Sequence, residues 1–328
     1  MGARFILPVM AFLGLSYALL AEARPDAVDL LRIAEAFRLA RAVGATVWPG
    51  WDTAPFPLLL VGTDREFLVA NPSVPAGFTS VGYSAILQTE IWSRPRRFDS
   101  GLLATLPAFG IPPVIVIGRA EITKKPSAAW VLTALHEHFH QFQMADSHYF
   151  SDVEQLGLSG GDQTGMWMLN YPFPYQSTEV GAAFSALSRE LVEMLRGSSR
   201  PDRQRFWEAY TKFLEGLSER DRRYLSFQVW QEGVARYIEL RVAEIGADRY
   251  SSSIEFQNLP DVQPLSAVAA GMRAAIVREL ANPDLQKNQR VSFYAFGAGL
   301  ALLLDQDTDT WKGRYMTEKF FLERYVGR

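Results

Sequence analysis

The chain has 328 residues, of which 48% are hydrophobic and 21% are charged, and its formal net charge is −3. This composition is typical of a globular protein with an extensive core, and the mildly acidic charge, with no long run of lysine and arginine, argues against a nucleic-acid-binding protein. The absence of cysteine excludes disulfides, thiolate zinc sites and thiol catalysis.

The first 23 residues have the pattern of a secretory signal. An arginine near the start precedes an apolar run at 5–20, and the run is followed by the letters AEA at 21–23. The run is shorter than the ~20 residues of a membrane-spanning helix, so an uncleaved anchor is the weaker alternative. The sequence predicts a signal peptide at 1–23, a periplasmic or secreted protein, and no stable membrane span after cleavage.

The next part of the chain, 24–125, is predicted to be rich in β-structure. It begins with an amphipathic helix at 26–44, where apolar residues recur at helical spacing up to a glycine. Four segments rich in β-forming residues then follow, separated by turn residues. The expected strands are 56–62, 66–70, 83–92 and 112–118.

The rest of the chain, 126–328, is predicted to be mainly helical. A glycine- and proline-rich loop at 157–176 interrupts this part, and loops of that length often border an active site. The order of elements predicts an α+β fold in which 24–328 forms one catalytic unit. The expected helices are 126–146, 177–197, 202–217, 219–246, 265–281 and 292–305.

The letters HEHFH at 136–140 hold three of the four histidines, and they fit the zinc-hydrolase motif H-E-x-x-H. On a helix, His136 and His140 lie on one side with Cβ atoms roughly 5–6 Å apart, so both imidazoles can reach one ion. Glu137 can then reach a water molecule on that ion and act as a general base. His138 points away and is expected either to pack against the fold or to lie behind the ligands. A chance cluster on a structural helix is the alternative.

A catalytic zinc needs a third protein ligand and an open fourth position. The remaining histidine, His148, lies beyond the expected end of the helix, so a carboxylate is favoured. Among the carboxylates, Glu179 near the start of an expected helix is a candidate, and Glu154 is a weaker one. Glu239, two helical turns after Glu232, is expected at the surface or behind the ligands.

The segment WQEGVARYIE at 230–239 resembles the W-x-E-G-x-A-x-Y segment of the gluzincins, zinc peptidases with a glutamate ligand. It is most similar to the bacterial peptidase-MA-like families. This resemblance implies a zincin-like fold and a zinc ion held by His136, His140 and Glu232. It also implies that Glu137 is the base and that a tyrosine on a later helix, Tyr294, assists the reaction.

The resemblance further implies that a small pair, Gly233 and Ala235, stands where two helices approach closely around the ion. An extended peptide or protein substrate would pair with a sheet edge from 45–125. We therefore expect an exported zinc metallopeptidase. The alternatives are a non-catalytic protein stabilised by a closed zinc site and a zinc hydrolase of a non-peptide amide.

Loop aromatics such as Trp167 and Tyr171 are expected either to line a cleft or to fill the core.

Overall fold

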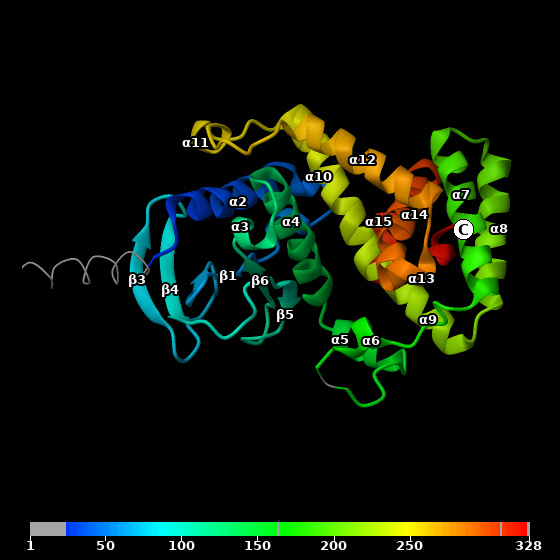
Figure 1. The fold of residues 1–328 in the computed structure, drawn as a ribbon, viewed down its shortest axis with the longest axis horizontal. Coiled ribbons are helices and arrows are strands. Elements are labelled where there is room, and N and C mark those ends of the chain that lie inside the picture. Colours follow the sequence, from blue (N-terminus) through cyan, green and yellow to red (C-terminus); the bar gives the residue numbers. More distant parts are fainter. Residues whose placement is uncertain (1–23, 163, 309, 327–328) are drawn as a thin grey trace, which may run out of the picture.

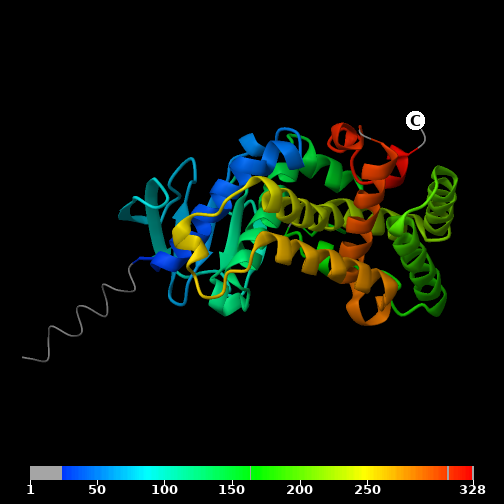
Figure 2. The ribbon, with the colours of Figure 1, turned by 90° about the horizontal axis from the view of Figure 1, so that it is seen from above.

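The computed structural model describes residues 24–162, 164–308 and 310–326. The signal peptide expected at 1–23 lies outside these residues. The fold is α+β, as predicted: a six-stranded sheet lies at one end, and the hairpin of α7 (Thr178–Arg196) and α8 (Arg200–Glu215) lies at the other (Figures 1 and 2). Among the described helices, none is both long and apolar enough to cross a bilayer.

The sheet has the strand order β3-β4-β2-β1-β6-β5. Strands β1 and β6 are parallel, whereas every other neighbouring pair is antiparallel. Strand β5 is therefore an edge of the sheet. The strands are β1 (Leu58–Val61), β2 (Arg65–Val69), β3 (Thr79–Ser84), β4 (Thr89–Pro95), β5 (Leu103–Leu106) and β6 (Val114–Gly118).

Both faces of the sheet are covered, which explains the unbroken apolar sequence of β1. Leu58 and Leu60 belong to the large core formed with helices α2 (Ala27–Val47) and α4 (Ser127–Met144). Leu59 on the opposite face belongs to a second, smaller core with Phe78, against which side chains of β4, β5 and the neighbouring loops pack. Successive residues of a strand point to opposite faces, so a strand buried on both sides shows no polar alternation.

Two differences from the predicted strands occur in this sheet. The expected strand at 83–92 is interrupted by a hairpin turn at 85–88, which joins the end of β3 to the start of β4. Gln88 closes that turn with φ of 55°, and this segment contains no glycine or proline to signal a turn. The edge strand β5 was not predicted, because its four residues are too few to show a period.

Helix α10 (Val234–Arg249) connects the two ends of the molecule. It packs against α2 and α4 on one side and against α12 (Leu265–Ala281) and α14 (Ser292–Asp307) on the other (Figure 1). It continues directly from α9 (Glu219–Gln228) through the π-helical turn η3 (Val229–Gly233). The short helices are η2 (Trp51–Thr53), α3 (Ala120–Thr123), α5 (Tyr149–Gln155), α6 (Trp167–Asn170), α11 (Ile254–Gln257), α13 (Leu285–Asn288), η4 (Gln289–Val291), α15 (Trp311–Arg314) and η5 (Leu322–Tyr325).

The predicted long helices are all present, with small shifts at their ends. Helix α2 continues three residues past Gly44, where the sequence predicted its end. Gly44 packs against Asp52, and a Cβ atom on Gly44 would lie 3.1 Å from the Asp52 Cα. This glycine therefore serves a close approach of two segments rather than a helix end. Helix α8 starts two residues before the predicted 202, because Ser199 and Asp202 form a capping box.

Candidate metal centre

Helix α4 holds His136 and His140 on one side, as their four-residue spacing predicted. Their Nε2 atoms lie 3.0 Å apart, and both side chains are buried. The pair sits well inside the helix, so the regular backbone around it fixes the separation of the two rings. Two imidazole nitrogens therefore converge on one point beside α4.

Glu232 lies at the same point, on the π-helical turn η3. Its Oε2 atom is 3.5 Å from Nε2 of His136 and 3.4 Å from Nε2 of His140. Donor atoms bound to a tetrahedral zinc at about 2.0–2.1 Å lie about 3.3 Å from one another. The three observed separations match one face of such a tetrahedron, so the donor set fits a zinc ion.

The outer nitrogens of both imidazoles lie beside acceptor oxygens. His140 Nδ1 is 2.6 Å from Gln143 Oε1, whereas the Gln143 amide donates to the Tyr315 hydroxyl at 2.6 Å. The glutamine therefore presents its oxygen to the ring. His136 Nδ1 is 3.0 Å from Glu239 Oε1, a close contact without the alignment of a regular hydrogen bond. Both rings are thus expected to carry their proton on Nδ1, which leaves the Nε2 lone pairs for a metal.

The charges of the centre favour a cation between these three atoms. Burial by itself lowers the pKa of His136, but the carboxylates of Glu232 and Glu239 outweigh it and raise that pKa overall. Burial raises the pKa of Glu232, yet the neighbouring histidines hold it well below its usual range. Two Nε2 lone pairs facing each other repel unless a proton or a metal ion lies between them. The same electrostatics that stabilise a proton there would stabilise a metal.

Glu137 lies next to this centre and is held by the edge strand of the sheet. Donor atoms of His136, Glu137 and His140 lie within 4.8 Å of one another. The Thr105 hydroxyl on β5 contacts both the backbone oxygen of Glu137, at 2.8 Å, and its Oε2 atom, at 2.9 Å. The carboxylate is therefore fixed by a strand 32 residues earlier in the chain.

Tyr294 approaches the centre from α14, where the resemblance placed it. Its ring lies 6.4 Å from the ring of His136, centroid to centroid. Burial raises its pKa, and the nearby Glu232 carboxylate raises it further, so the phenol keeps its proton. The guanidinium of Arg290, one turn earlier in the chain, donates to the Tyr294 hydroxyl at 2.6 Å.

The close approach of α14 to η3 depends on two glycines. A Cβ atom on Gly233 would lie 2.5 Å from the Cα atom of Gly297, too close for any side chain. The prediction that Gly233 stands at a close helix contact is confirmed. π-Helical turns are frequent at functional sites, and this one turns Glu232 towards α4.

His138 and the other candidate ligands lie elsewhere. His138 is buried and stacks on Phe56 with ring centroids 3.9 Å apart, and burial lowers its pKa to about 4. His148 is exposed beside Ser147, with 3.2 Å between its Nδ1 and the serine Oγ. Glu179 and Glu154 are exposed on α7 and α5.

The aromatic side chains of the loop at 157–176 mostly fill the core. Trp167, Tyr171 and Phe173 are buried, and the Tyr171 ring stacks on that of Tyr224 at 4.3 Å. The sequence predicted that such residues either line a cleft or fill the core, and these three fill the core.

Three contributors to the site were not identified from the sequence: Thr105, Gln143 and Arg290. Gln143 is three residues after His140 on the same helix face, so its spacing was a usable signal. Arg290 is four residues before Tyr294, which is also neighbouring spacing on a helix. Thr105 gave no such signal, because its contact with Glu137 depends on how the sheet packs against α4.

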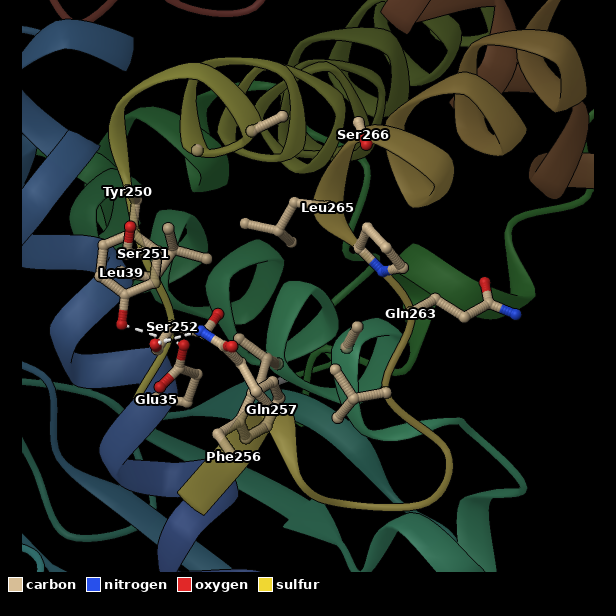
Figure 3. A pocket seen from close by; sticks show the side chains of 16 residues that line it. Glu35, Leu39, Tyr250, Ser251, Ser252, Phe256, Gln257, Gln263, Leu265 and Ser266 are labelled. Carbon is tan, nitrogen blue, oxygen red and sulfur yellow. Dashed lines mark hydrogen bonds between the residues drawn. The ribbon is translucent and has the colours of Figure 1, made fainter. Parts of the chain in front are cut away.

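A separate cavity of about 420 Å³ lies near the start of α4, between α2 and the segment that carries α11 (Figure 3). Leu39 and Leu265 form apolar parts of its wall, and the buried Glu35 accepts a hydrogen bond from the Tyr250 hydroxyl at 3.0 Å. None of the histidines at 136–140 lines it.

A comparison of the chain with protein-family models, curated proteins and solved structures found no match.

Proposed function

We propose that this protein is a zinc-dependent peptidase. The observation that carries the proposal is the triangle of His136 Nε2, His140 Nε2 and Glu232 Oε2, with sides of 3.0–3.5 Å and Glu137 beside it. Three protein ligands leave a fourth position open, which is the pattern of catalytic rather than structural zinc sites. The exposed position of His148 gives no support to a closed, four-ligand site.

His136, His140 and Glu232 would hold the zinc. A bound zinc supplies a water molecule with a pKa near 7 and polarises the substrate carbonyl. The chain contributes the base: Glu137 takes the proton of the attacking water and later passes it to the leaving amine. Because Thr105 donates to Oε2 of this carboxylate, Oε1 is the oxygen that we expect to carry the proton.

Tyr294 would stabilise the oxyanion that forms on the substrate. Its oxygen accepts a hydrogen bond from Arg290, and its own O–H proton faces the Glu232 carboxylate, from which it would turn to the oxyanion when substrate binds. Each donor of this kind contributes about 10²–10³ in rate. Since the pKa of Tyr294 is raised, the phenol remains a donor at neutral pH.

The edge strand β5 would align the substrate. It pairs with β6 on one side only, and its Thr105 touches Glu137. An extended peptide added at this edge would run past the proposed base. The preferred substrate class is therefore a peptide or an unfolded protein segment. The proposal includes export, which rests on the signal peptide expected at 1–23.

Zinc content and peptide cleavage test the proposal together. Elemental analysis should find about one zinc per chain and much less in Glu232→Ala, whereas Glu179→Ala should keep its zinc. In a mixed peptide library analysed by mass spectrometry, Glu137→Gln should lose about 10²-fold or more of the cleavage rate while retaining zinc. Full zinc in Glu232→Ala would overturn the ligand set, and cleavage by Glu137→Gln would overturn the mechanism.

A further inference from the structure

Arg290 has a guanidinium beside the candidate metal centre that forms no direct ion pair with a carboxylate among the described residues. It lies in η4, just before α14, and its guanidinium is 5.6 Å from the centre of the Tyr294 ring. Its one hydrogen bond among the described residues is the donation to the Tyr294 hydroxyl. A guanidinium has several N–H donors in a fixed fork, so most of its binding capacity is unused.

Several other arginines that are buried or half-buried differ in this respect, whereas Arg65 and Arg222 are half-buried and, like Arg290, form no ion pair among the described residues. Arg32 contacts Asp29 and Glu121, Arg94 is paired with Glu66 at 2.7 Å, and Arg203 contacts Asp307. Burying a cation costs free energy, and proteins usually offset that cost with a carboxylate partner. Arg290 is half-buried without such a partner in the part of the chain that the structure describes.

The groups around Arg290 are mainly tyrosine hydroxyls, which stay neutral. Burial raises the pKa of Tyr175 and of Tyr224, so neither supplies a phenolate near neutral pH. Glu232 is the carboxylate whose charge reaches Arg290, but its Oε2 atom lies between the two histidines of the centre. The positive charge of Arg290 is thus left for a ligand.

We infer that Arg290 forms a subsite for a carboxylate of the substrate, next to the bond that is cleaved. This inference rests on the proposed peptidase function and adds the substrate class to it. Arginine matches a carboxylate with two parallel hydrogen bonds, which are stronger than bonds between neutral groups. The carboxylate would come from a free C-terminus or from an acidic side chain.

The position of Arg290 favours substrate binding over direct contact with the reacting carbonyl. Tyr294 is the residue that lies against His136, and Arg290 meets the centre through the Tyr294 hydroxyl. A group held by Arg290 would therefore lie one side chain away from the metal ligands. This is the placement of a residue that determines specificity.

Small zinc-chelating probes test the subsite without catalysis. Isothermal titration calorimetry on the zinc-loaded protein would compare the monohydroxamates of malonic, succinic and glutaric acid with the matching amides, in which the carboxylate is replaced by a carboxamide. We expect at least one acid to bind about tenfold or more tightly than its amide, a difference of about 1.4 kcal/mol. Equal affinities for every acid and amide pair would overturn the subsite and leave the zinc centre intact.

If no hydroxamate binds to the zinc-loaded protein, the proposed function fails, and the subsite fails with it. Arg290→Gln should remove the preference for the acid, and Arg290→Lys should retain part of it. Arg249→Gln removes the same charge from an exposed position on α10 and should change nothing. Tyr294→Phe should keep the preference, because it retains the guanidinium. Loss of the preference in Arg249→Gln, or its persistence in Arg290→Gln, would contradict the assignment.

Matched peptides identify the source of the carboxylate. Each library peptide would be offered with a free C-terminus, as its C-terminal amide, and with an aspartate or glutamate next to the scissile bond. A preference for the free C-terminus indicates an exopeptidase, and a preference for the acidic side chain indicates an endopeptidase. In either case the preference should be lost in Arg290→Gln. Equal cleavage of all three forms would contradict the subsite.

Discussion

Gly233 and Gly297 meet backbone to backbone where the π-helical turn η3 crosses helix α14. A Cβ atom on Gly297 would lie 2.7 Å both from Gly233 Cα and from the backbone oxygen of Val229. This contact brings α14, with Tyr294, against the turn that carries Glu232. The geometry of the candidate metal centre therefore depends on two residues that have no side chain.

Gly297→Ala should push α14 away from η3. Overpacking of this kind typically costs about 1–3 kcal/mol in the free energy of unfolding, and the shift should also weaken zinc binding. Chemical denaturation and zinc titration measure the two effects. Gly271→Ala on α12 is the matched control, since nothing lies within 4 Å of its Cβ position and alanine favours helices. Equal stability of the two variants would contradict the close packing of η3 against α14.

Thr105→Val should reduce cleavage while leaving the zinc content unchanged. The valine side chain has the same shape as that of threonine but cannot donate to Oε2 of Glu137, so the base loses its fixed orientation. We expect roughly a tenfold loss in kcat, measured on the best peptide from the library. Thr105→Ser keeps the hydroxyl and should retain most of the activity. An unchanged kcat in Thr105→Val would mean that α4 alone positions Glu137.

Glu239→Gln should weaken zinc binding without removing a ligand. The carboxylate lies 3.0 Å from His136 Nδ1 and increases the electron density of that ring. Loss of such a partner typically costs 10–100-fold in metal affinity. Competition with a chelator of known affinity would measure the change, and Glu255→Gln at an exposed site on α11 serves as control. Equal affinities in the two variants would place Glu239 outside the metal centre.

Asp29 should make the protein less stable as the pH rises from about 4 to 6. Burial raises its pKa to about 6, although Arg119 partly offsets this effect. In the unfolded chain Asp29 ionises near its ordinary pKa, so within this window the unfolded state binds fewer protons than the folded state. Its contribution to the free energy of unfolding therefore falls with rising pH and levels off above about 6.

Asp29→Asn removes this titration. The difference in stability between the variant and the natural protein should change by at most about 3 kcal/mol between pH 4 and 7, in favour of asparagine at the higher pH. Urea unfolding at several pH values measures it, and titrating groups that do not interact with Asp29 cancel in the difference. Parallel stability curves for the two proteins would contradict the raised pKa.

Local patterns in the sequence were sufficient to predict the mixed α+β fold and the long helices. Helix α12, for example, has the predicted bounds, because its apolar spacing and its end residues are encoded within the segment itself. The edge strand β5 and the hairpin of β3 and β4 were missed. A four-residue strand shows no period, and a turn closed by Gln88 carries no ordinary turn residue.

The sequence by itself determined that His136, Glu137 and His140 share one region of a helix, because four residues are close to one helical turn. Only the tertiary structure decided which carboxylate faces them, since Glu232, Glu179 and Glu154 all fit the sequence alone. That choice depends on the packing of α10 against α4, because α10 continues directly from the turn η3 that carries Glu232. Thr105 likewise acquires its role from packing between distant segments, since it lies 32 residues before Glu137. Such contacts depend on how whole elements fit together, and short sequence patterns do not record that.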